Sequence, residues 1–221
     1  MTAPVVSSRH GVTLIGGGAV APGDLEQALA LAPLLVAADG GAAAALDHGL
    51  QPAAVIGDFD SLSPAAKAQL PPEALHHVAE QDSTDFQKCL TRIDAPFVLA
   101  VGFSGRRLDH TLAALNVLAR LPAPHVVLIA AEDIVFLCPP HLSLRLPIGS
   151  RLSLFPMGPA RGSSSGLEWP IDGLEFRPDG RSGTSNRVTG PVQLDIEGPM
   201  LVMLPRAAMA AALDGLGFGG D

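Results

Sequence analysis

A short apolar strand that ends in two aspartates constrains this chain more than any other segment. Residues 55–61 read Val-Ile-Gly-Asp-Phe-Asp-Ser, which predicts a buried strand followed by Asp58 and Asp60. Side chains alternate between the faces of a strand, so the two carboxylates share a face if the strand continues through them. Aspartate and serine are also common in turns, so an ordinary solvated turn is the structural alternative. The carboxyl end of a strand lies at the edge of an α/β sheet where ligands usually bind. Two carboxylates at that edge predict a site for Mg²⁺ and for a polyphosphate that binds with it.

Apolar strands and helical patterns alternate over the first 138 residues. Strands are predicted at 11–15, 34–38, 53–56, 76–78, 97–101, 125–130 and 134–138. This alternation predicts an α/β domain over residues 1–138, with a doubly wound, mostly parallel sheet covered on both faces. Because the carboxyl ends of parallel strands meet at one edge, we expect the polar residues that follow four of these strands to converge there.

The chain changes character after Pro139 and Pro140, which mark the predicted domain boundary. No long helical pattern follows before Ala207, where a short helix is expected. Short strands are predicted at 142–146, 151–155, 173–176, 192–196 and 200–204, separated by glycine, proline, serine and asparagine. Residues 141–221 are therefore predicted to form a smaller all-β sandwich or barrel.

Composition and charge narrow the functional classes. Hydrophobic residues make up 48% of the 221-residue chain and charged residues 16%, which excludes global disorder. The net charge of −8 argues against a nucleic-acid-binding surface, although a bound metal reverses the local sign at a nucleotide site. Cys89 and Cys138 are too few for a disulfide framework. Residues 1–18 show no secretion signal, and no apolar run approaches the ~20 residues of a spanning helix, so we expect a soluble, cytoplasmic protein.

Glycine-rich turns follow the first two predicted strands. Gly16, Gly17 and Gly18 precede a helical pattern that begins at Asp24. Such a turn lets backbone N–H groups approach a phosphate, and it is equally an ordinary tight turn between strand and helix. The second strand ends at Asp39-Gly40-Gly41, which adds a third acid to the same edge and glycines that allow a close ligand approach.

Residues 81–88, Gln-Asp-Ser-Thr-Asp-Phe-Gln-Lys, lie at the start of a predicted helix. Acids at a helix N-terminus complement the helix dipole, which is a sufficient structural explanation for them. Helical spacing also places Asp85 and Lys88 on one face. Because the chain has two lysines, Lys67 and Lys88, the position of one beside an acidic cluster favours a functional interpretation, although a surface ion pair has the same pattern.

Residues 102–110, Gly-Phe-Ser-Gly-Arg-Arg-Leu-Asp-His, follow the fifth predicted strand and lead into an amphipathic helix. A glycine loop with paired arginines suits phosphate oxygens, and Asp109 suits a helix cap that orients an arginine. His110 is more typical of a polar helix start than of a catalyst. In the second domain, Trp169 fits core packing, and residues 182–186, Ser-Gly-Thr-Ser-Asn, fit an ordinary polar turn.

The ordered set of these motifs resembles the thiamine pyrophosphokinase family. Segments 39–42, 57–61, 81–88 and 105–110 stand in the order and spacing of its catalytic domain, and 166–169 and 182–186 resemble its thiamine-binding elements. One residue departs from the pattern. The family usually has Gly-Gly-Arg where this chain has Gly105-Arg106-Arg107, so the loop must tolerate a Cβ or bear strain. Either arginine is a candidate phosphate contact, and Arg107 is favoured because it stands where the family motif has its arginine.

The resemblance implies transfer of diphosphate from ATP to the hydroxyl of thiamine, giving thiamine diphosphate and AMP, by a homodimer that binds thiamine between the catalytic domain of one subunit and the β domain of the other. It implies Mg²⁺ as cofactor. The implied metal ligands are Asp39, Asp58, Asp60 and Asp85. The implied catalytic residues are Asp58, Asp60, Asp85, Lys88 and Arg107, with Lys88 and Arg107 on phosphates and Asp85, then Asp58, as candidate bases. The implied ATP- and thiamine-binding residues are Asp39, Gly40, Gln81, Asp82, Thr84, Asp109, Trp169, Ser185 and Asn186.

Two alternative functions remain open at this point. A pyrophosphokinase for another hydroxymethyl heterocycle, such as a pterin, would keep the acidic edge and need no thiazolium pocket. A non-catalytic nucleotide-sensing module would bind Mg²⁺-ATP without forming AMP. Four converging acidic segments exceed what binding alone needs, so the sensor ranks last.

Overall fold

The computed structural model describes residues 3–219, which form a mixed α/β fold of two compact units. The first unit holds residues 3–117 and 126–131, and the second holds 118–125 and 132–219. Strand β9 (Asp133–Leu137) lies in the second unit, although the sequence placed this strand before the predicted boundary at Pro139. The reason is its pairing, because β9 runs antiparallel to β15 (Met200–Pro205). The division of the chain into an α/β domain at 1–138 and a β-rich domain at 141–221, each with its own function, stays a prediction.

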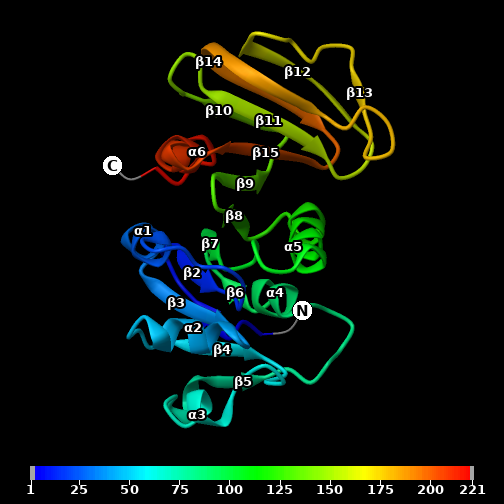
Figure 1. The fold of residues 1–221 in the computed structure, drawn as a ribbon. Coiled ribbons are helices and arrows are strands. Elements are labelled where there is room, and N and C mark those ends of the chain that lie inside the picture. Colours follow the sequence, from blue (N-terminus) through cyan, green and yellow to red (C-terminus); the bar gives the residue numbers. More distant parts are fainter. Residues whose placement is uncertain (1–2, 220–221) are drawn as a thin grey trace. The chain divides into compact units, whose positions relative to one another are not determined.

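The sheet of the first unit has the strand order β8-β7-β2-β3-β4-β5 (Figure 1). The β2–β3, β2–β7, β3–β4 and β4–β5 pairs are parallel, as the alternation of strands and helices predicted. The strands are β2 (Val12–Ile15), β3 (Leu34–Ala38), β4 (Ala54–Gly57), β5 (Leu75–His77), β7 (Phe97–Val101) and β8 (His125–Ile129). A separate parallel pair joins β1 (Val6–Ser7) and β6 (Ile93–Asp94).

The strand order reverses at β2, which is the first strand of this sheet in the sequence. Strands β3, β4 and β5 follow on one side of it, and β7 and β8 lie on the other. The loops after β2 and β7 therefore leave the sheet at a topological switch point, where α/β sheets bind ligands. The two loops touch: the Gly18 N–H donates to the Gly102 carbonyl at 2.6 Å, and a Cβ on Gly16 would lie 2.7 Å from the same oxygen. The glycines therefore allow the loops to pack together.

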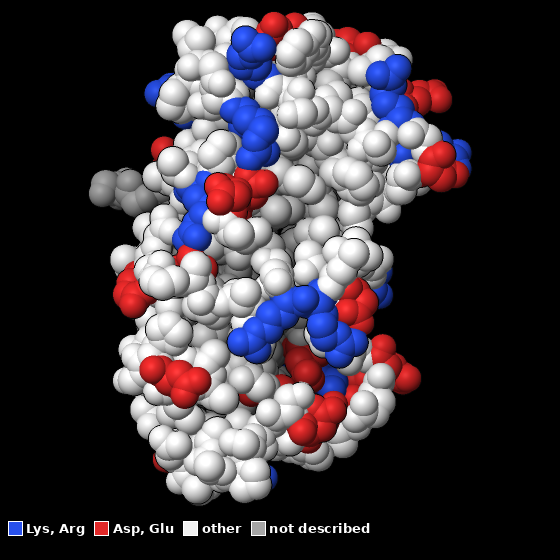
Figure 2. Space-filling model, in the orientation of Figure 1, with Lys and Arg blue, Asp and Glu red and all other residues white. Residues whose placement is uncertain are grey.

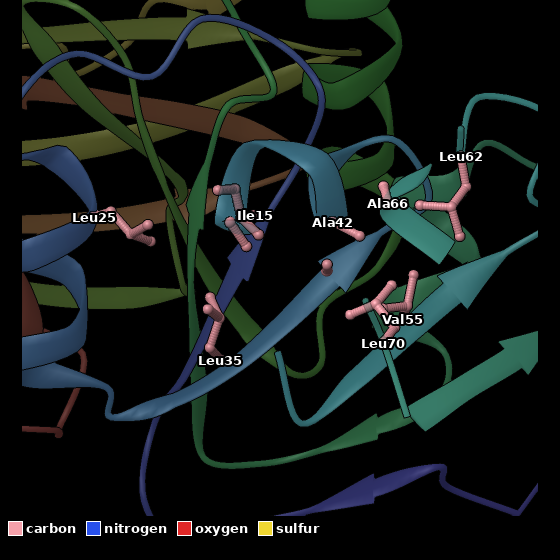
Figure 3. Packing of buried hydrophobic residues seen from close by; sticks show 10 residues of the cluster. Ile15, Leu25, Leu35, Ala42, Val55, Leu62, Ala66 and Leu70 are labelled. Carbon is pink, nitrogen blue, oxygen red and sulfur yellow. The ribbon is translucent and has the colours of Figure 1, made fainter. Parts of the chain in front are cut away.

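Helices cover both faces of this sheet. A buried cluster joins α1, α2 and α3 to strand residues such as Leu35 and Val55 (Figure 3). Because strand side chains alternate, Val36 and Ile56 face the other side, and α4 packs against β3 and β4. None of the helices within residues 3–219 combines the length and apolar character needed to cross a membrane. The helices are α1 (Asp24–Leu31), α2 (Gly41–Asp47), α3 (Pro64–Lys67), α4 (Asp85–Leu90), α5 (Leu108–Arg120) and the 3₁₀ turn η1 (Pro72–Ala74).

The second unit is built on the long strand β14 (Thr184–Glu197). The early part of β14 pairs antiparallel with β11, its later part pairs with β10, and β12 runs along its other edge. β11 continues the order through β15 to β9. The remaining elements are β10 (His141–Leu144), β11 (Arg151–Pro156), β12 (Ala160–Leu167), β13 (Glu175–Phe176), η2 (Arg206–Ala208) and α6 (Met209–Gly215).

Two strands of this unit differ from the sequence prediction. The segment Ala160–Leu167, rich in serine and glycine, was interpreted as a spacer and is strand β12. Its pairing explains this result, because a Cβ on Gly162 would lie 2.1 Å from the Asp195 carbonyl, so a glycine is required for the approach to β14. β14 itself begins at Thr184, so the last three residues of the predicted polar turn at 182–186 belong to the strand.

Candidate functional site

A cavity of about 670 Å³ lies in the first unit, where the loops after β2, β3, β4 and β7 and the starts of α4 and α5 come together. Figure 2 shows basic side chains along the rim of a hollow that holds acidic and basic side chains. The residues that line the cavity are Gly16, Gly17, Gly18, Ala38, Gly40, Asp58, Asp60, Ser61, Gln81, Ser83, Thr84, Asp85, Phe86, Lys88, Gly102, Phe103, Ser104, Arg106, Arg107, His110, Ala113 and Ala114.

Three carboxylates come together beside this cavity. One ligand oxygen from each of Asp39, Asp58 and Asp60 lies within 4.8 Å of the others. Asp39 is 1% exposed, and its Oδ2 accepts a hydrogen bond from the Ser61 N–H at 3.1 Å, whereas its Oδ1 has no partner. Burial raises the pKa of Asp39 to about 6, and the nearby Asp60 and Asp85 add to the effect. A buried carboxylate oxygen without a partner, in a group of three, suits a hard cation with oxygen ligands.

The turn between Asp58 and Asp60 differs from the predicted geometry. Strand β4 ends at Gly57, so the two aspartates do not share a strand face. Phe59 instead adopts the left-handed conformation with φ 66°, which is uncommon for a residue with a Cβ. Its ring packs 5.5 Å from the ring of His77, and the Lys67 ammonium lies 5.4 Å from its centroid. A strained turn with an anchored ring therefore presents the two carboxylates.

The glycines after β3 provide space for close packing, and Gly40 lines the cavity. Gly40 and Gly41 do not have positive φ, and it is Asp39, with φ 39°, that adopts the left-handed conformation. Gly41 is required for space, because a Cβ there would lie 2.2 Å from the Ile15 carbonyl. Similarly, a Cβ on Gly57 would lie 2.8 Å from the Asp39 Cβ. Glycine thus lets the acid-bearing turns approach each other.

Lys88 pairs with two of the acids. Its Nζ lies 2.7 Å from Asp58 Oδ2 and 3.1 Å from Asp85 Oδ1, and its side chain is 2% exposed. Gln81 Nε2 also donates to Asp58 Oδ2, at 3.1 Å. The hydrogen bond from Lys88 lowers the pKa of Asp58, whereas burial raises the pKa of Asp85 despite the same lysine. Burial acts to lower the pKa of Lys88, but the two carboxylates outweigh it and the pKa is raised.

Of the two acids in segment 81–88, Asp85 faces the cavity and Asp82 does not, because helix α4 begins between them. Thr84 caps the helix, since its Oγ1 accepts from the Gln87 N–H at 3.2 Å. Asp85 then stands in the first turn and faces the cavity with Lys88, as the spacing predicted. Asp82 is exposed and outside the cavity lining, and its N–H donates to Glu80 at 2.9 Å. The structure therefore brings Gln81, Thr84 and Asp85 to the cavity but not the Asp82 side chain.

Both arginines of the loop after β7 line the cavity. Arg106 donates to the Gly17 carbonyl at 3.3 Å, which joins this loop to the glycine turn after β2. Arg107 pairs with Asp109 at 2.6 Å, and both of these side chains are about two-thirds exposed. Asp109 itself is outside the lining. The loop bears no strain at Arg106, because the left-handed residue is Gly105, with φ 92°.

In the second unit, the candidate residue Asn186 holds the backbone of Trp169. Trp169 is 52% exposed, so the core packing favoured by the sequence is wrong. Asn186 is 3% exposed: its Oδ1 accepts from the N–H groups of Trp169 and Arg187, and its Nδ2 donates to the Trp169 carbonyl at 2.6 Å. The Arg187 guanidinium lies 5.8 Å from the Trp169 ring centroid and pairs with Glu168. Ser185 is exposed on β14.

Several residues at the cavity were not singled out from the sequence. Ser61 donates its N–H to Asp39, and its hydroxyl donates to Asp60 at 2.9 Å. Phe103 and Phe86 line the cavity with ring centroids 4.3 Å apart. The position of Ser61 next to Asp60 was an available signal. The spacing of residues in the sequence could not have indicated Phe103, because the ring that it packs against, Phe86, comes from a different segment of the chain.

The segment that carries the acids of the cavity also matches a known family of proteins. Residues 25–129, which include every acid of the cavity, match the family model described as "Thiamin pyrophosphokinase, catalytic domain". This segment is therefore similar to the catalytic domain of the thiamine pyrophosphokinase family. Thiamine pyrophosphokinase 1 of Oryza sativa subsp. japonica is 31% identical over 157 residues, 62% of this chain and 60% of the relative. Thiamine pyrophosphokinase 1 of Arabidopsis thaliana is 30% identical over 166 residues, 66% of this chain and 62% of the relative.

The likeness to solved structures extends over more of the chain. The thiamin pyrophosphokinase of Candida albicans has a TM-score of 0.75 at 18% identity and covers 92% of each chain. At that identity the likeness concerns the fold. This chain matches only 60–62% of the length of the two plant thiamine pyrophosphokinases.

Proposed function

We propose that this chain is a thiamine pyrophosphokinase, which transfers diphosphate from ATP to the hydroxyl of thiamine and releases AMP. One observation supports this most: the three carboxylates grouped within 4.8 Å lie inside the segment that matches the family's catalytic domain. In this proposal, the first unit is a doubly wound α/β catalytic domain, and the second is a smaller β domain that binds thiamine. A cytoplasmic location is part of the same proposal.

Mg²⁺ is the proposed cofactor, and the residues present fit it. Asp39, Asp58 and Asp60 offer grouped oxygens, and one oxygen of Asp39 is buried without a partner. When bound, Mg²⁺ would neutralise charge on the phosphate oxygens of ATP. Asp85 lies outside this group of three, so its role as a ligand stays a prediction. Arg106 and Arg107 lie at the cavity with guanidinium groups suited to phosphate oxygens.

The reaction requires alignment and a proton acceptor more than covalent chemistry by the protein. The thiamine hydroxyl oxygen forms a bond to the β-phosphorus of ATP, the bond from that phosphorus to the α–β bridging oxygen breaks, and AMP leaves with the oxygen. The hydroxyl proton passes to a carboxylate and from there to solvent. Asp85 suits this step, because burial raises its pKa and makes it a better base than an exposed aspartate.

Thiamine recognition is assigned to Trp169 in this proposal. A half-exposed indole offers a face to a cationic thiazolium ring. Asn186 would act by holding the backbone of Trp169, since its amide group is already engaged there. We further propose a homodimer, in which Trp169 of one copy serves the cavity of the other.

The test is an assay of purified protein with ATP, Mg²⁺ and thiamine, with thiamine diphosphate and AMP measured by mass spectrometry. A parallel reaction replaces thiamine with a hydroxymethylpterin. We expect equal amounts of thiamine diphosphate and AMP with thiamine, and neither diphosphate product nor AMP with the pterin. Binding of Mg²⁺-ATP without AMP formation would contradict the proposal and favour the nucleotide sensor.

Complementation tests the homodimer. Variants Asp58→Asn and Trp169→Ala are unfolded together and refolded as a mixture, so that mixed dimers form. At a thiamine concentration well below KM, a site that combines two copies will make the mixture more active than either variant alone, because one site of each mixed dimer keeps both residues. Activity equal to the mean of the two variants would contradict the shared site.

A further inference from the structure

Lys88 is buried and paired, although the family resemblance assigns it to phosphate. Its side chain is 2% exposed, and its ammonium contacts Asp58 at 2.7 Å and Asp85 at 3.1 Å. Asp58 follows strand β4, whereas Asp85 stands in the first turn of α4, so the lysine joins carboxylates from two separate elements. The ammonium therefore links the turn after β4 to the first turn of α4.

Lys88 also helps to fix the orientation of Asp58. Oδ2 of Asp58 accepts from Lys88 and Gln81, and Oδ1 accepts from the Asp60 N–H at 3.3 Å. Of these three donors, the lysine alone is charged. Grouped carboxylates repel one another, and the positive charge of Lys88 offsets that repulsion when no metal is bound.

The arginines at the cavity are better placed for phosphate than Lys88 is. The side chain of Arg107 is 66% exposed, and Arg106 is also exposed. A guanidinium presents several donors in a plane and matches phosphate oxygens in pairs. An ammonium that already donates to two carboxylates has one donor left for any further contact.

We propose that Lys88 is a positioning residue, a built-in counter-ion that holds Asp58 and Asp85 in place before a metal binds, rather than a phosphate contact. The proposal deepens the proposed function of the same site. Its main test uses stability and Mg²⁺ alone, without ATP or thiamine, so that it stands whether or not the chain transfers diphosphate.

The experiment compares thermal unfolding of four proteins, each with EDTA and with Mg²⁺: the unsubstituted chain, Lys88→Met, Lys88→Met with Asp85→Asn, and Lys67→Met. Methionine keeps an unbranched apolar stem and removes the charge. Lys67 is the matched control, because it is the only other lysine of the chain and is exposed.

In EDTA, we expect Lys88→Met to unfold roughly 5–10 °C below Lys67→Met, because unpaired carboxylates are left facing each other. Mg²⁺ will raise the unfolding temperature of Lys88→Met more than that of the unsubstituted chain, since the added cation replaces the lost charge. The double variant will unfold at a higher temperature than Lys88→Met, because Asp85→Asn removes one of the repelling charges. If Lys88→Met folds only with Mg²⁺, that result supports the proposal too.

Three outcomes would overturn the proposal. The first is an unfolding temperature of Lys88→Met in EDTA equal to that of Lys67→Met. The second is a Mg²⁺-induced rise no larger than that of the unsubstituted chain. The third is a double variant no more stable than Lys88→Met.

A second measurement compares kcat and KM for ATP between Lys88→Met and the unsubstituted chain. A lysine that served stability alone would leave both values unchanged. At saturating Mg²⁺, we expect Lys88→Met to lower kcat by roughly 10- to 100-fold and to leave KM for ATP nearly unchanged, because misplaced carboxylates affect the reaction more than nucleotide binding. A large rise in KM for ATP with unchanged kcat would instead establish a phosphate contact. If even the unsubstituted chain forms no AMP, the proposed function fails while the stability test of Lys88 remains valid.

Discussion

The acidic cavity of the first unit and the Trp169 surface of the second are held in place by different interactions. In the cavity, a buried ammonium and left-handed backbone at Asp39 and Phe59 orient charged groups that repel each other. Around Trp169, the uncharged amide of Asn186 makes three hydrogen bonds to backbone groups. The first arrangement depends on charge balance and the second on hydrogen-bond geometry. Substitutions should therefore affect the cavity through its chemistry and the Trp169 surface through stability and affinity.

The largest expected effect is at Asp58. Asp58→Asn should lower AMP formation with thiamine and ATP by about 10³-fold or more, because it removes a charge from the grouped carboxylates. Circular dichroism should show a native fold, since asparagine keeps the shape and one acceptor. Asp82→Asn is the matched control, because Asp82 is outside the cavity lining. Equal losses in both variants would show that net charge, and not the cavity geometry, sets the rate.

The next effect concerns the hydrogen bonds beneath Trp169. Asn186→Ala should lower the free energy of unfolding by about 1–3 kcal/mol, because it leaves backbone donors and an acceptor of Trp169 and Arg187 without partners. Urea unfolding measures this change. Ser185→Ala, at the exposed neighbouring position, is the control and should change the free energy by less than about 0.5 kcal/mol. Similar losses at both positions would contradict the special role of the amide.

A smaller effect is expected for the indole itself. Trp169→Ala should raise KM for thiamine about 10-fold, because a cation on an aromatic face contributes on the order of 1–2 kcal/mol. KM for ATP and the unfolding temperature should stay nearly constant, since the ring is half-exposed. Trp169→Phe should retain most of the affinity. A rise in KM for ATP as well as for thiamine would show that Trp169 does not act on thiamine binding alone.

The smallest effect tests backbone strain at Phe59. Phe59→Ala and Phe59→Gly both lose the ring contacts with His77 and Lys67. Glycine adopts positive φ freely, so Phe59→Gly should be more stable than Phe59→Ala by about 1 kcal/mol, the reverse of the usual order. Urea unfolding of the two variants decides this, and greater stability of Phe59→Ala would show that the turn relaxes out of the left-handed conformation.

The first unit was easier to predict from the sequence than the second. Its strands are continuous apolar runs that alternate with helices, and this pattern predicts a mostly parallel sheet covered by helices. The acids stand directly after these strands or at the start of a helix. β12 was missed because its serines and glycines have low strand propensity, and its conformation depends on pairing with β14. Trp169 was wrongly assigned to the core because residue type alone favours burial of an indole, whereas Asn186 holds its backbone at the surface.

The sequence by itself determined where the acids stand: after apolar strands and at a helix start, because hydrophobic periodicity and helix capping are local properties. Only the tertiary structure decided which of these acids are buried and what balances their charge. Asp39 meets Ser61 across 22 residues, and Asp58 meets Lys88 across 30. Burial, charge pairing and pKa depend on such distant neighbours, which no local pattern specifies. The charge balance of the cavity is thus a property of the fold.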